Sequence, residues 1–308
     1  MTIGIPRALF YHYHPGMWEA LFDALGHEPV LSGVTTDATV EAGGRLAESE
    51  ACLSCKVFAG HCAQLAGKGV DALFIPRYFS VIRNAICCPK LYALAETTAA
   101  ELPCAPRIIR PRVDANREPL TVTLCRVAAM FTKNPSRIWR AVARARAALA
   151  PPGCAPHPRA PGAGVRVLLL GHAYNLGDQR VNHHITRMLE ALGCAVVPSV
   201  SVVMRAAHRG RRWHFLDEAL WCAGEAAVEG WHGVVHLSAF NCGCDAVVKS
   251  MLERQCRARG LPYLPLVVDE HTESGAVQTR VEAFVDSLGD GGEAAWNGGA
   301  VTNMAEAV

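Results

Sequence analysis

Six of the thirteen cysteines of this chain stand as three close pairs, namely Cys52 with Cys55, Cys87 with Cys88, and Cys242 with Cys244. Each pair lies where a predicted strand gives way to a loop or a helix. Thiolates gathered from separate parts of a chain are the usual ligands of structural zinc and of iron–sulfur clusters. The pattern therefore favours a redox protein that binds an iron–sulfur cluster.

The pair Cys242 and Cys244 follows the predicted strand 233–237 and precedes a predicted helix. The free amides and the dipole at a helix N-terminus favour a thiolate over a thiol. In open parallel sheets, binding sites form beyond the carboxyl ends of the strands. We therefore expect this pair at the edge of a crevice.

The other two pairs are held by different local features. Pro89 stiffens the loop that carries Cys87 and Cys88, and it keeps the residue before it extended. Cys52 and Cys55 are three residues apart, so they share one face of a helix. Both features would aim the thiols reproducibly.

Zinc is the main competing ion for these cysteines. Zinc ribbons use two C-x2-C knuckles, and among the three pairs only Cys52 and Cys55 have that spacing. The spacing therefore favours an iron–sulfur cluster and does not exclude a zinc site. The remaining cysteines are predicted to be small core hydrophobes: Cys62, Cys104, Cys125, Cys154, Cys194, Cys222 and Cys256.

The composition is that of a globular protein. The chain has 308 residues, 51% of them hydrophobic, and a formal net charge of +2, which gives no basis for nucleic-acid binding. The N-terminus lacks the features of a signal peptide, and no apolar stretch approaches the roughly 20 residues that span a bilayer. Irregularly spaced cysteines then suit a reducing cytosol. We predict a soluble cytoplasmic protein with neither nucleic acid nor membrane as a partner.

Short apolar runs alternate with helical patterns along the chain, which predicts an α/β fold with mainly parallel sheets. Strands are predicted at 2–5, 29–31, 72–75, 165–170, 195–197, 233–237 and 263–268. Helices are predicted at 17–25, 52–66, 182–192 and 246–259, and helical structure over 120–150. Two Rossmann-like domains, with the cluster site in the crevice between them, are the simplest architecture.

The domain boundaries follow from composition. Residues 1–150 are predicted to form an N-terminal Rossmann-like domain with a helical extension. Residues 151–164 hold five prolines and three glycines and are predicted to be a linker. Residues 165–288 form a C-terminal Rossmann-like domain, and the glycine- and alanine-rich residues 289–308 form a flexible tail.

Several motifs in a fixed order carry a resemblance to a known family. They are Ile3–Leu9, Glu50–Lys56, Gly60–His61, Asp71–Arg77, Cys88–Lys90, Gly171–Asp178, Phe240–Gly243, Asp269–His271 and Thr279–Phe284. With them the chain resembles the 2-hydroxyacyl-CoA dehydratase D-component and double-cubane cluster protein superfamily. The branch of acyl-CoA dehydratase activase-related proteins is the most similar. The resemblance extends over nearly the whole chain up to about residue 288.

The resemblance implies a cofactor and its ligands. Relatives hold an iron–sulfur cluster through three cysteines, which correspond to Cys52, Cys88 and Cys242. One related branch binds an 8Fe–9S double cubane through six cysteines. Here Cys55, Cys87 and Cys244 stand where the activase-related branch is expected to lack cysteine, so they would form a second ligand set. One 4Fe–4S cluster and a double cubane both stay open.

The resemblance also implies function and partners. We predict an iron–sulfur redox protein that accepts low-potential electrons from a separate ATP-hydrolysing iron–sulfur activase and reduces a small-molecule substrate. One alternative is a subunit of a 2-hydroxyacyl-CoA dehydratase, and another is a non-catalytic electron-relay or scaffold subunit. A homodimer or a related subunit would be a further partner.

Three polar residues are candidates for catalysis. His172 and the neighbouring Glu270 and His271 each follow a predicted strand at its carboxyl end, where they could exchange protons with a substrate. For all three, a structural role in a turn is the alternative. Lys56 and Lys90 closely follow cysteine pairs and could offset the negative charge of thiolates and cluster.

Overall fold

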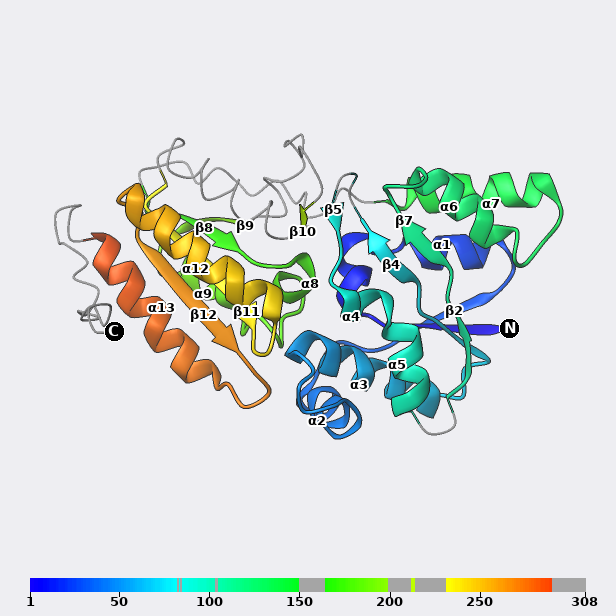
Figure 1. The fold of residues 1–308 in the computed structure, drawn as a ribbon, viewed down its shortest axis with the longest axis horizontal. Coiled ribbons are helices and arrows are strands. Elements are labelled where there is room, and N and C mark those ends of the chain that lie inside the picture. The colour runs from blue at the N-terminus through cyan, green and yellow to red at the C-terminus, as the bar shows by residue number, and fades with distance from the viewer. Residues whose placement is uncertain are drawn as a thin grey trace, which may run out of the picture.

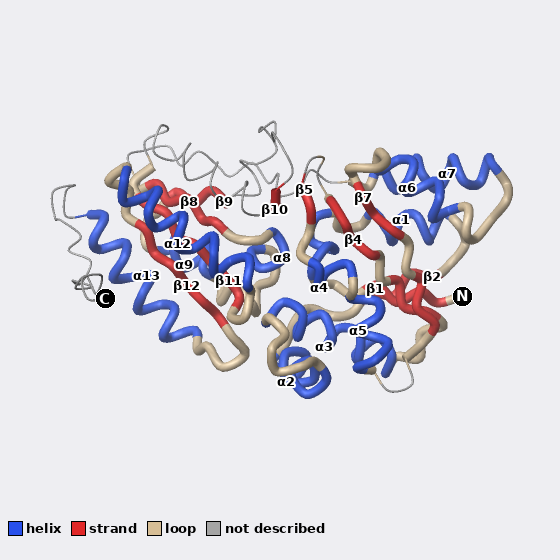
Figure 2. The backbone as a smooth tube through the Cα atoms, in the orientation of Figure 1, coloured by secondary structure: helices blue, strands red, loops and turns tan. Residues whose placement is uncertain are grey.

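The computed structural model describes residues 1–81, 83, 85–102, 105–149, 164–198, 212–213 and 231–289. Two α/β units lie side by side along the long axis of the molecule (Figure 1), and both are built on parallel strands (Figure 2). The predicted α/β fold of two Rossmann-like units is thereby confirmed. The predicted linker 151–164 and tail 289–308 lie outside the described residues except at Gly164 and Gly289, and the domain boundaries stay predictions.

The N-terminal unit is organised around a parallel sheet with the strand order β2-β1-β3-β6. Its strands are β1 (Thr2–Ile5), β2 (Glu28–Leu31), β3 (Ala72–Phe74) and β6 (Arg107–Ile109). All residues of β3 and most of β1 are buried, as is usual for strands covered by helices on both faces. The order reverses direction between β1 and β3, which makes that position the topological switch point.

Helices cover this sheet and extend beyond it. They are α1 (Met17–Ala24), α2 (Asp37–Leu46), α3 (Leu53–Gly67), α4 (Pro89–Tyr92), α5 (Leu94–Glu101), α6 (Leu120–Ala128) and α7 (Pro135–Ala147), with a 3-10 helix η1 (Leu9–Tyr13). The predicted helical region 120–150 is confirmed as the pair α6 and α7, which pack on each other and on α1. Asn134 caps α7, and Pro135 begins it, which explains why the region is divided here.

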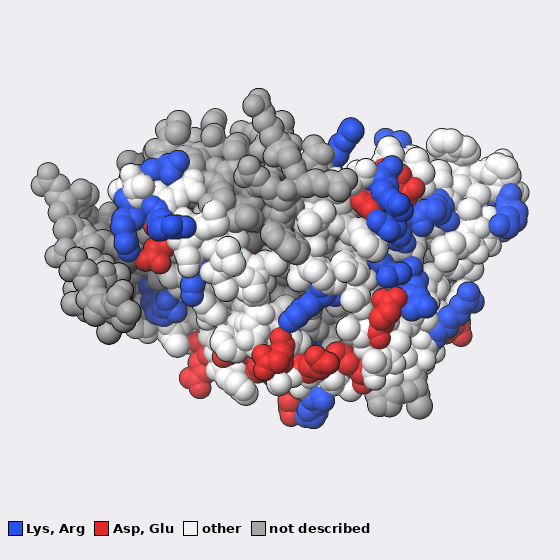
Figure 3. All heavy atoms as spheres, in the orientation of Figure 1, with Lys and Arg blue, Asp and Glu red and all other residues white. Residues whose placement is uncertain are grey.

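Short strands form two further parallel ribbons, β4 (Arg77–Ser80) with β7 (Arg112–Asp114) and β5 (Ala85–Ile86) with β10 (Arg212–Trp213). Figure 3 shows basic side chains gathered over the β4–β7 ribbon and α5. Several of them form ion pairs, since Arg77 and Arg110 contact Glu96, and Arg112 contacts Asp114. This basic surface is therefore partly neutralised by its own acidic neighbours.

The C-terminal unit repeats the strand order of the first. Its sheet runs β9-β8-β11-β12, which in chain order is again second, first, third, fourth. The strands are β8 (Arg166–Leu170), β9 (Ala195–Pro198), β11 (Gly233–Ala239) and β12 (Tyr263–Val268), and the helices are α8 (Ala173–Leu176), α9 (Ile185–Ala191), α12 (Gly243–Ala258) and α13 (Ser274–Gly289). Within the described ranges, no helix is both long and apolar enough to cross a membrane.

Two glycines let helices α2 and α3 pack backbone against backbone. A Cβ atom added at Gly43 would lie 1.8 Å from the carbonyl oxygen of Lys56, and one at Gly60 would lie 2.0 Å from that of Thr39. Real Cβ atoms do not approach a backbone oxygen this closely, so only glycine fits at either position. The crossing fixes the position of α3 on α2.

Helix α3 also forms polar contacts with the C-terminal unit. The Lys56 side chain is only 8% exposed, and its Nζ lies 2.6 Å from Glu270 Oε1 in the loop after β12. Two residues earlier, the buried Ser54 hydroxyl donates a hydrogen bond of 2.7 Å to Asn175 Oδ1 in α8. Helix α3 is therefore anchored from both sides.

Candidate functional site

A cavity between the two units brings all six paired cysteines together. Its empty volume is about 540 Å³, part of it open to solvent. The N-terminal unit contributes Phe10, Tyr13, Cys52, Cys55, Ile86, Cys87, Cys88, Lys90 and Leu91, and the C-terminal unit contributes His172, Tyr174, Cys242 and Cys244. Cysteines almost 200 positions apart in sequence, Cys52 and Cys244, thus face one cavity, in the crevice where a site was expected.

Three of the cysteines share one structural role. Cys52, Cys88 and Cys242 are the N-cap residues of α3, α4 and α12, and none of the three side chains caps its own helix. A helix that connects parallel strands runs back across the sheet, so its N-terminus lies at the carboxyl edge of the strands. The free amides and dipoles at these N-termini favour negative charge on the sulfurs.

The companion cysteines occupy different positions. Cys55 and Cys244 lie within the first turn of α3 and α12, and Cys87 precedes Cys88 in the loop after β5. Cys87 belongs to the buried core of the N-terminal unit, and its thiol is hydrogen-bonded to the backbone at Val81. Of the six cysteines, Cys87 is the least exposed residue.

The thiols contact one another in two pairs. Cys52 Sγ lies 3.5 Å from Cys55 Sγ within the first turn of α3. Cys88 and Cys244 both line the cavity and shift each other's pKa, and this interaction crosses from one unit to the other. Each pair therefore joins one cysteine of the first expected ligand set to one cysteine of the second.

Within each pair, the interaction lowers the pKa of one thiol and raises the pKa of the other. The hydrogen bond with Cys55 lowers the pKa of Cys52 to about 7, and the hydrogen bond with Cys244 lowers the pKa of Cys88 to about 6, with Lys90 assisting both. The same bonds and burial raise the pKa of Cys55 and Cys244. The surroundings of Cys52 and Cys88 thus favour a thiolate near neutral pH, and the thiols of Cys55 and Cys244 remain protonated beside them.

Burial dominates at the other two thiols. It raises the pKa of Cys87 to about 12. Burial and the adjacent Asp245 carboxylate raise the pKa of Cys242. Neither thiol is prepared as a thiolate by its protein surroundings alone.

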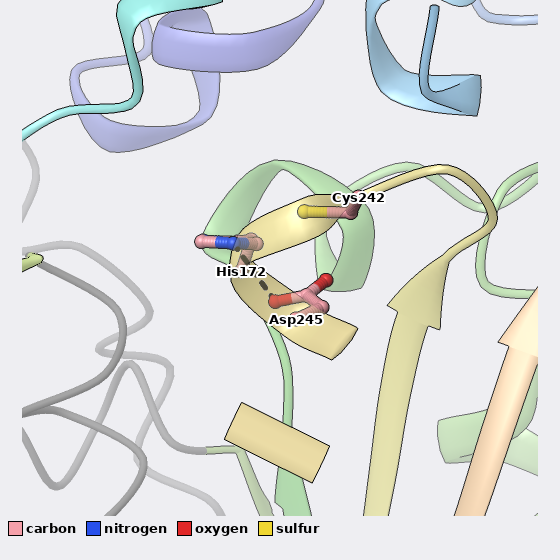
Figure 4. Close-up of side chains that lie close together, drawn as sticks. All are labelled: His172, Cys242 and Asp245. Atoms are coloured by element: carbon pink, nitrogen blue, oxygen red, sulfur yellow. Dashed lines mark ion pairs between the residues drawn. The ribbon is translucent and has the colours of Figure 1, made fainter. Parts of the chain in front are cut away.

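His172 lines the cavity beside a buried carboxylate, as Figure 4 shows. It is the N-cap residue of α8, directly after β8, and its Nε2 lies 3.2 Å from Asp245 Oδ1 in the first turn of α12. Burial opposes charge on Asp245, yet His172 and His236 keep the pKa of this carboxyl below its usual range. His172 and Cys242 follow β8 and β11, the two strands at the switch point of the C-terminal sheet.

Asp245 is a site residue that the sequence reasoning missed. The signal was present, since an acidic residue three positions after a helix-capping residue is typical of a first helical turn. The aromatic wall of Phe10, Tyr13 and Tyr174 was missed as well, because η1 and α8 are single turns without a helical repeat. Only the fold brings these rings to the cysteines.

Glu270 and His271, the two other predicted catalytic residues, do not line the cavity. Glu270 pairs with Lys56, which lowers the pKa of its carboxyl, and His271 is exposed at the same loop. Lys90, in contrast, lines the cavity, and its Nζ donates a hydrogen bond of 2.9 Å to the carbonyl of Glu50. Of the two lysines expected to offset negative charge, Lys90 is therefore the one that faces the sulfurs.

A smaller donor set lies inside the same site. One ligand atom each from His172, Cys242 and Asp245 lie within 4.8 Å of one another (Figure 4). Mixed nitrogen, sulfur and oxygen donors suit a single zinc ion. The zinc alternative thus has a concrete location, but one that would use only one of the six paired cysteines.

Comparison with known proteins gives one family and no close relative. No curated protein matches the chain. Among solved structures, the periplasmic zinc binding protein TroA from Treponema pallidum aligns with 93% of this chain and 97% of its own at 10% identity, but the TM-score of 0.26 is too low to carry a conclusion. A family model described as the CoA enzyme activase uncharacterised domain (DUF2229) matches residues 2–202. This chain belongs to that family.

Proposed function

We propose that this chain is an iron–sulfur redox protein. It would accept low-potential electrons from a separate ATP-hydrolysing activase and reduce a small molecule in the cavity between its two units. The observation that carries the proposal is the convergence of six cysteine side chains on one cavity. The family description supports the activase as partner, because it names an enzyme activase.

The residues around the cavity fit an iron–sulfur cluster. Cysteine thiolates are the ligands of such clusters, and their potential depends on charge, hydrogen bonds to sulfur and exposure to solvent. Cys52, Cys88 and Cys242 would hold a first cluster from three helix N-termini, and Cys55, Cys87 and Cys244 would add a second set. The finer placement in the dehydratase D-component superfamily is part of this proposal.

The cluster would supply one-electron chemistry, and the chain's own residues would prepare the space around it. Phe10, Tyr13 and Tyr174 limit the access of water to the sulfurs. Lys90 places a positive charge beside a region where several thiolates would otherwise repel one another. His172, held by Asp245, is positioned to donate or accept a proton at its ring nitrogen.

Anaerobic reconstitution tests the proposal. The full chain would be incubated with ferrous iron and sulfide, desalted, and assayed for bound iron and sulfide and by electron paramagnetic resonance. About four irons per chain would support one cubane, and about eight would support the six-cysteine arrangement. Stoichiometric zinc without iron after expression in iron-replete cells would contradict both.

A matched pair of variants ties the result to the cavity. Cys88→Ala removes a sulfur from the cavity wall, whereas Cys125→Ala removes one from α6, outside the cavity lining. We expect the first variant to lose its iron and the second to retain it. Equal retention by both variants would show that the iron is bound elsewhere.

A further inference from the structure

The first turn of α3 has the geometry of a dithiol pair. The N–H groups of both Cys55 and Lys56 donate to the carbonyl of Cys52, at 2.9 and 3.1 Å. This tight turn brings the two thiols to 3.5 Å. A C-x2-C sequence that begins at a helix N-terminus is the arrangement in which dithiol–disulfide oxidoreductases interconvert a dithiol and a disulfide.

A second pair faces the first across the same cavity. Cys88 and Cys244 both line this cavity and shift each other's pKa, and both are partly exposed. Cys88 belongs to the N-terminal unit and Cys244 to the C-terminal unit, so a bond between them would join the two units covalently. The remaining sulfurs have other partners, since Cys87 contacts the backbone at Val81 and Cys242 contacts Asp245.

We propose that the cluster-free chain is a redox-active dithiol protein in which a small organic disulfide oxidises two specific pairs, Cys52 with Cys55 and Cys88 with Cys244. The pairing is set by which thiols already interact across the cavity wall, and Cys87 and Cys242 stay reduced. Four of the six sulfurs at the cavity are then withdrawn from metal binding. The Cys88–Cys244 bond also holds the crevice closed.

The chemistry is thiol–disulfide exchange and balances without a further oxidant. The Cys52 thiolate attacks one sulfur of the small disulfide, which forms a mixed disulfide and releases one thiolate. The Cys55 thiolate then attacks Cys52 Sγ, forms the protein disulfide and releases the second thiolate. Two cysteines lose two electrons and two protons, and the small disulfide gains both as two thiols. The same two steps apply to Cys88 and Cys244.

The reaction needs only the cluster-free chain, so it can be tested separately from the cluster. The full chain would be stripped of metal, reduced, desalted under nitrogen and incubated with oxidised glutathione. Free thiols would be alkylated, and the disulfides would be mapped by mass spectrometry without reduction. We expect two bonds, Cys52–Cys55 and Cys88–Cys244, with Cys87 and Cys242 alkylated.

Variants distinguish the two bonds and report on folding. Cys244→Ser should lose the bond between the units and the faster migration that it causes in a non-reducing denaturing gel. The same variant should still form Cys52–Cys55, which shows that the two bonds form independently. Cys55→Ser should leave Cys52 as a stable mixed disulfide with glutathione. Cys125→Ser is the matched control and should behave like the unaltered chain.

Iron uptake by the same preparation completes the test. The oxidised chain should bind little iron until a dithiol reductant is added. Scrambled disulfides, a bond that includes Cys87 or Cys242, or the absence of any disulfide would overturn the inference. A chain that binds iron but forms neither bond would leave the proposed function intact, whereas one that forms both bonds but binds no iron after reduction would refute the proposed function alone.

Discussion

The two units share a strand order but contribute different chemistry to the cavity. The N-terminal unit provides four of the six cysteines, a lysine and two aromatic rings, whereas the C-terminal unit provides two cysteines and the buried pair of His172 and Asp245. In the C-terminal unit the contributing loops follow β8 and β11, the strands at the switch point. In the N-terminal unit only η1 follows such a strand, whereas Cys52 and Cys55 come after α2 and Cys87 and Cys88 come after β5. The same sheet order is thus used with different connecting segments, and the residues in these segments decide what each side supplies.

The largest expected effect tests whether both units are needed for the cluster. Cys242→Ala removes the N-cap sulfur of α12, and we expect the chain to lose most of the iron that it binds after reconstitution, as Cys88→Ala should. Cys87→Ala should lose the least, because that sulfur is buried in the core and bonded to backbone. If Cys242→Ala keeps its iron while Cys88→Ala loses it, the cluster belongs to the N-terminal unit alone.

The next effect concerns the ion pair that joins the units. Lys56→Met leaves Glu270 partly buried without its partner, which should lower the free energy of unfolding by about 3 kcal/mol. Replacing both residues, as Lys56→Met with Glu270→Leu, should cost less than the single change, because no charge is left unpaired. Denaturant unfolding of the single and double variants measures the difference. Equal losses in all variants would mean that the pair does not couple the units.

A smaller effect concerns the carboxylate that only the C-terminal unit supplies. Asp245 raises the pKa of Cys242, so Asp245→Asn should lower that pKa and increase the thiolate fraction. We expect iodoacetamide to alkylate Cys242 in the cluster-free chain roughly three- to tenfold faster. The alkylation rate of Cys52 in the same digests is the internal control. An unchanged rate at Cys242 would show that Asp245 does not control the reactivity of this thiol.

The smallest effect is a pH dependence of the contact between the units. Lys56 holds the pKa of Glu270 below its ordinary value of 4.5, so the native state favours the charged carboxylate. The resulting stability is complete above that ordinary value and is lost as pH falls through the lower native pKa. Unfolding measured between pH 7 and pH 3 should therefore show a shallower acid loss in Glu270→Gln. If the free energy of unfolding falls in parallel with pH in the unaltered chain and in Glu270→Gln, the ion pair of Lys56 and Glu270 does not cause this pH dependence.

Much of the fold could be predicted because the buried strands are short, apolar and continuous. Strands 2–5, 165–170 and 263–268 were found within a residue or two, since each is bounded by clear turn signals. Helix α2 was not found, because two glycines and few apolar residues hide its pattern. Those glycines reflect its packing on α3, which no local signal reports.

The sulfurs of the site could be predicted, but their surroundings could not. The pairs stood out because cysteine is rare and its spacing is informative. Tyr13 and Phe10 line the cavity, and Asp245 contacts His172, only because of the way in which strands and helices are assembled. Glu270 was singled out as catalytic, whereas its contact with Lys56 arises only when the two units meet.

The crossing of α2 and α3 has a consequence for how this protein would respond to random mutation. Alanine at Gly60 adds one methyl group, yet that group would collide with the backbone of α2, and α3 would have to slide. Cys52 and Cys55 stand at the end of the same helix and would move with it. In a screen for loss of the proposed iron–sulfur cluster, substitutions at Gly43 and Gly60 should therefore be found together with substitutions at the cysteines, although neither glycine has a side chain that could bind iron.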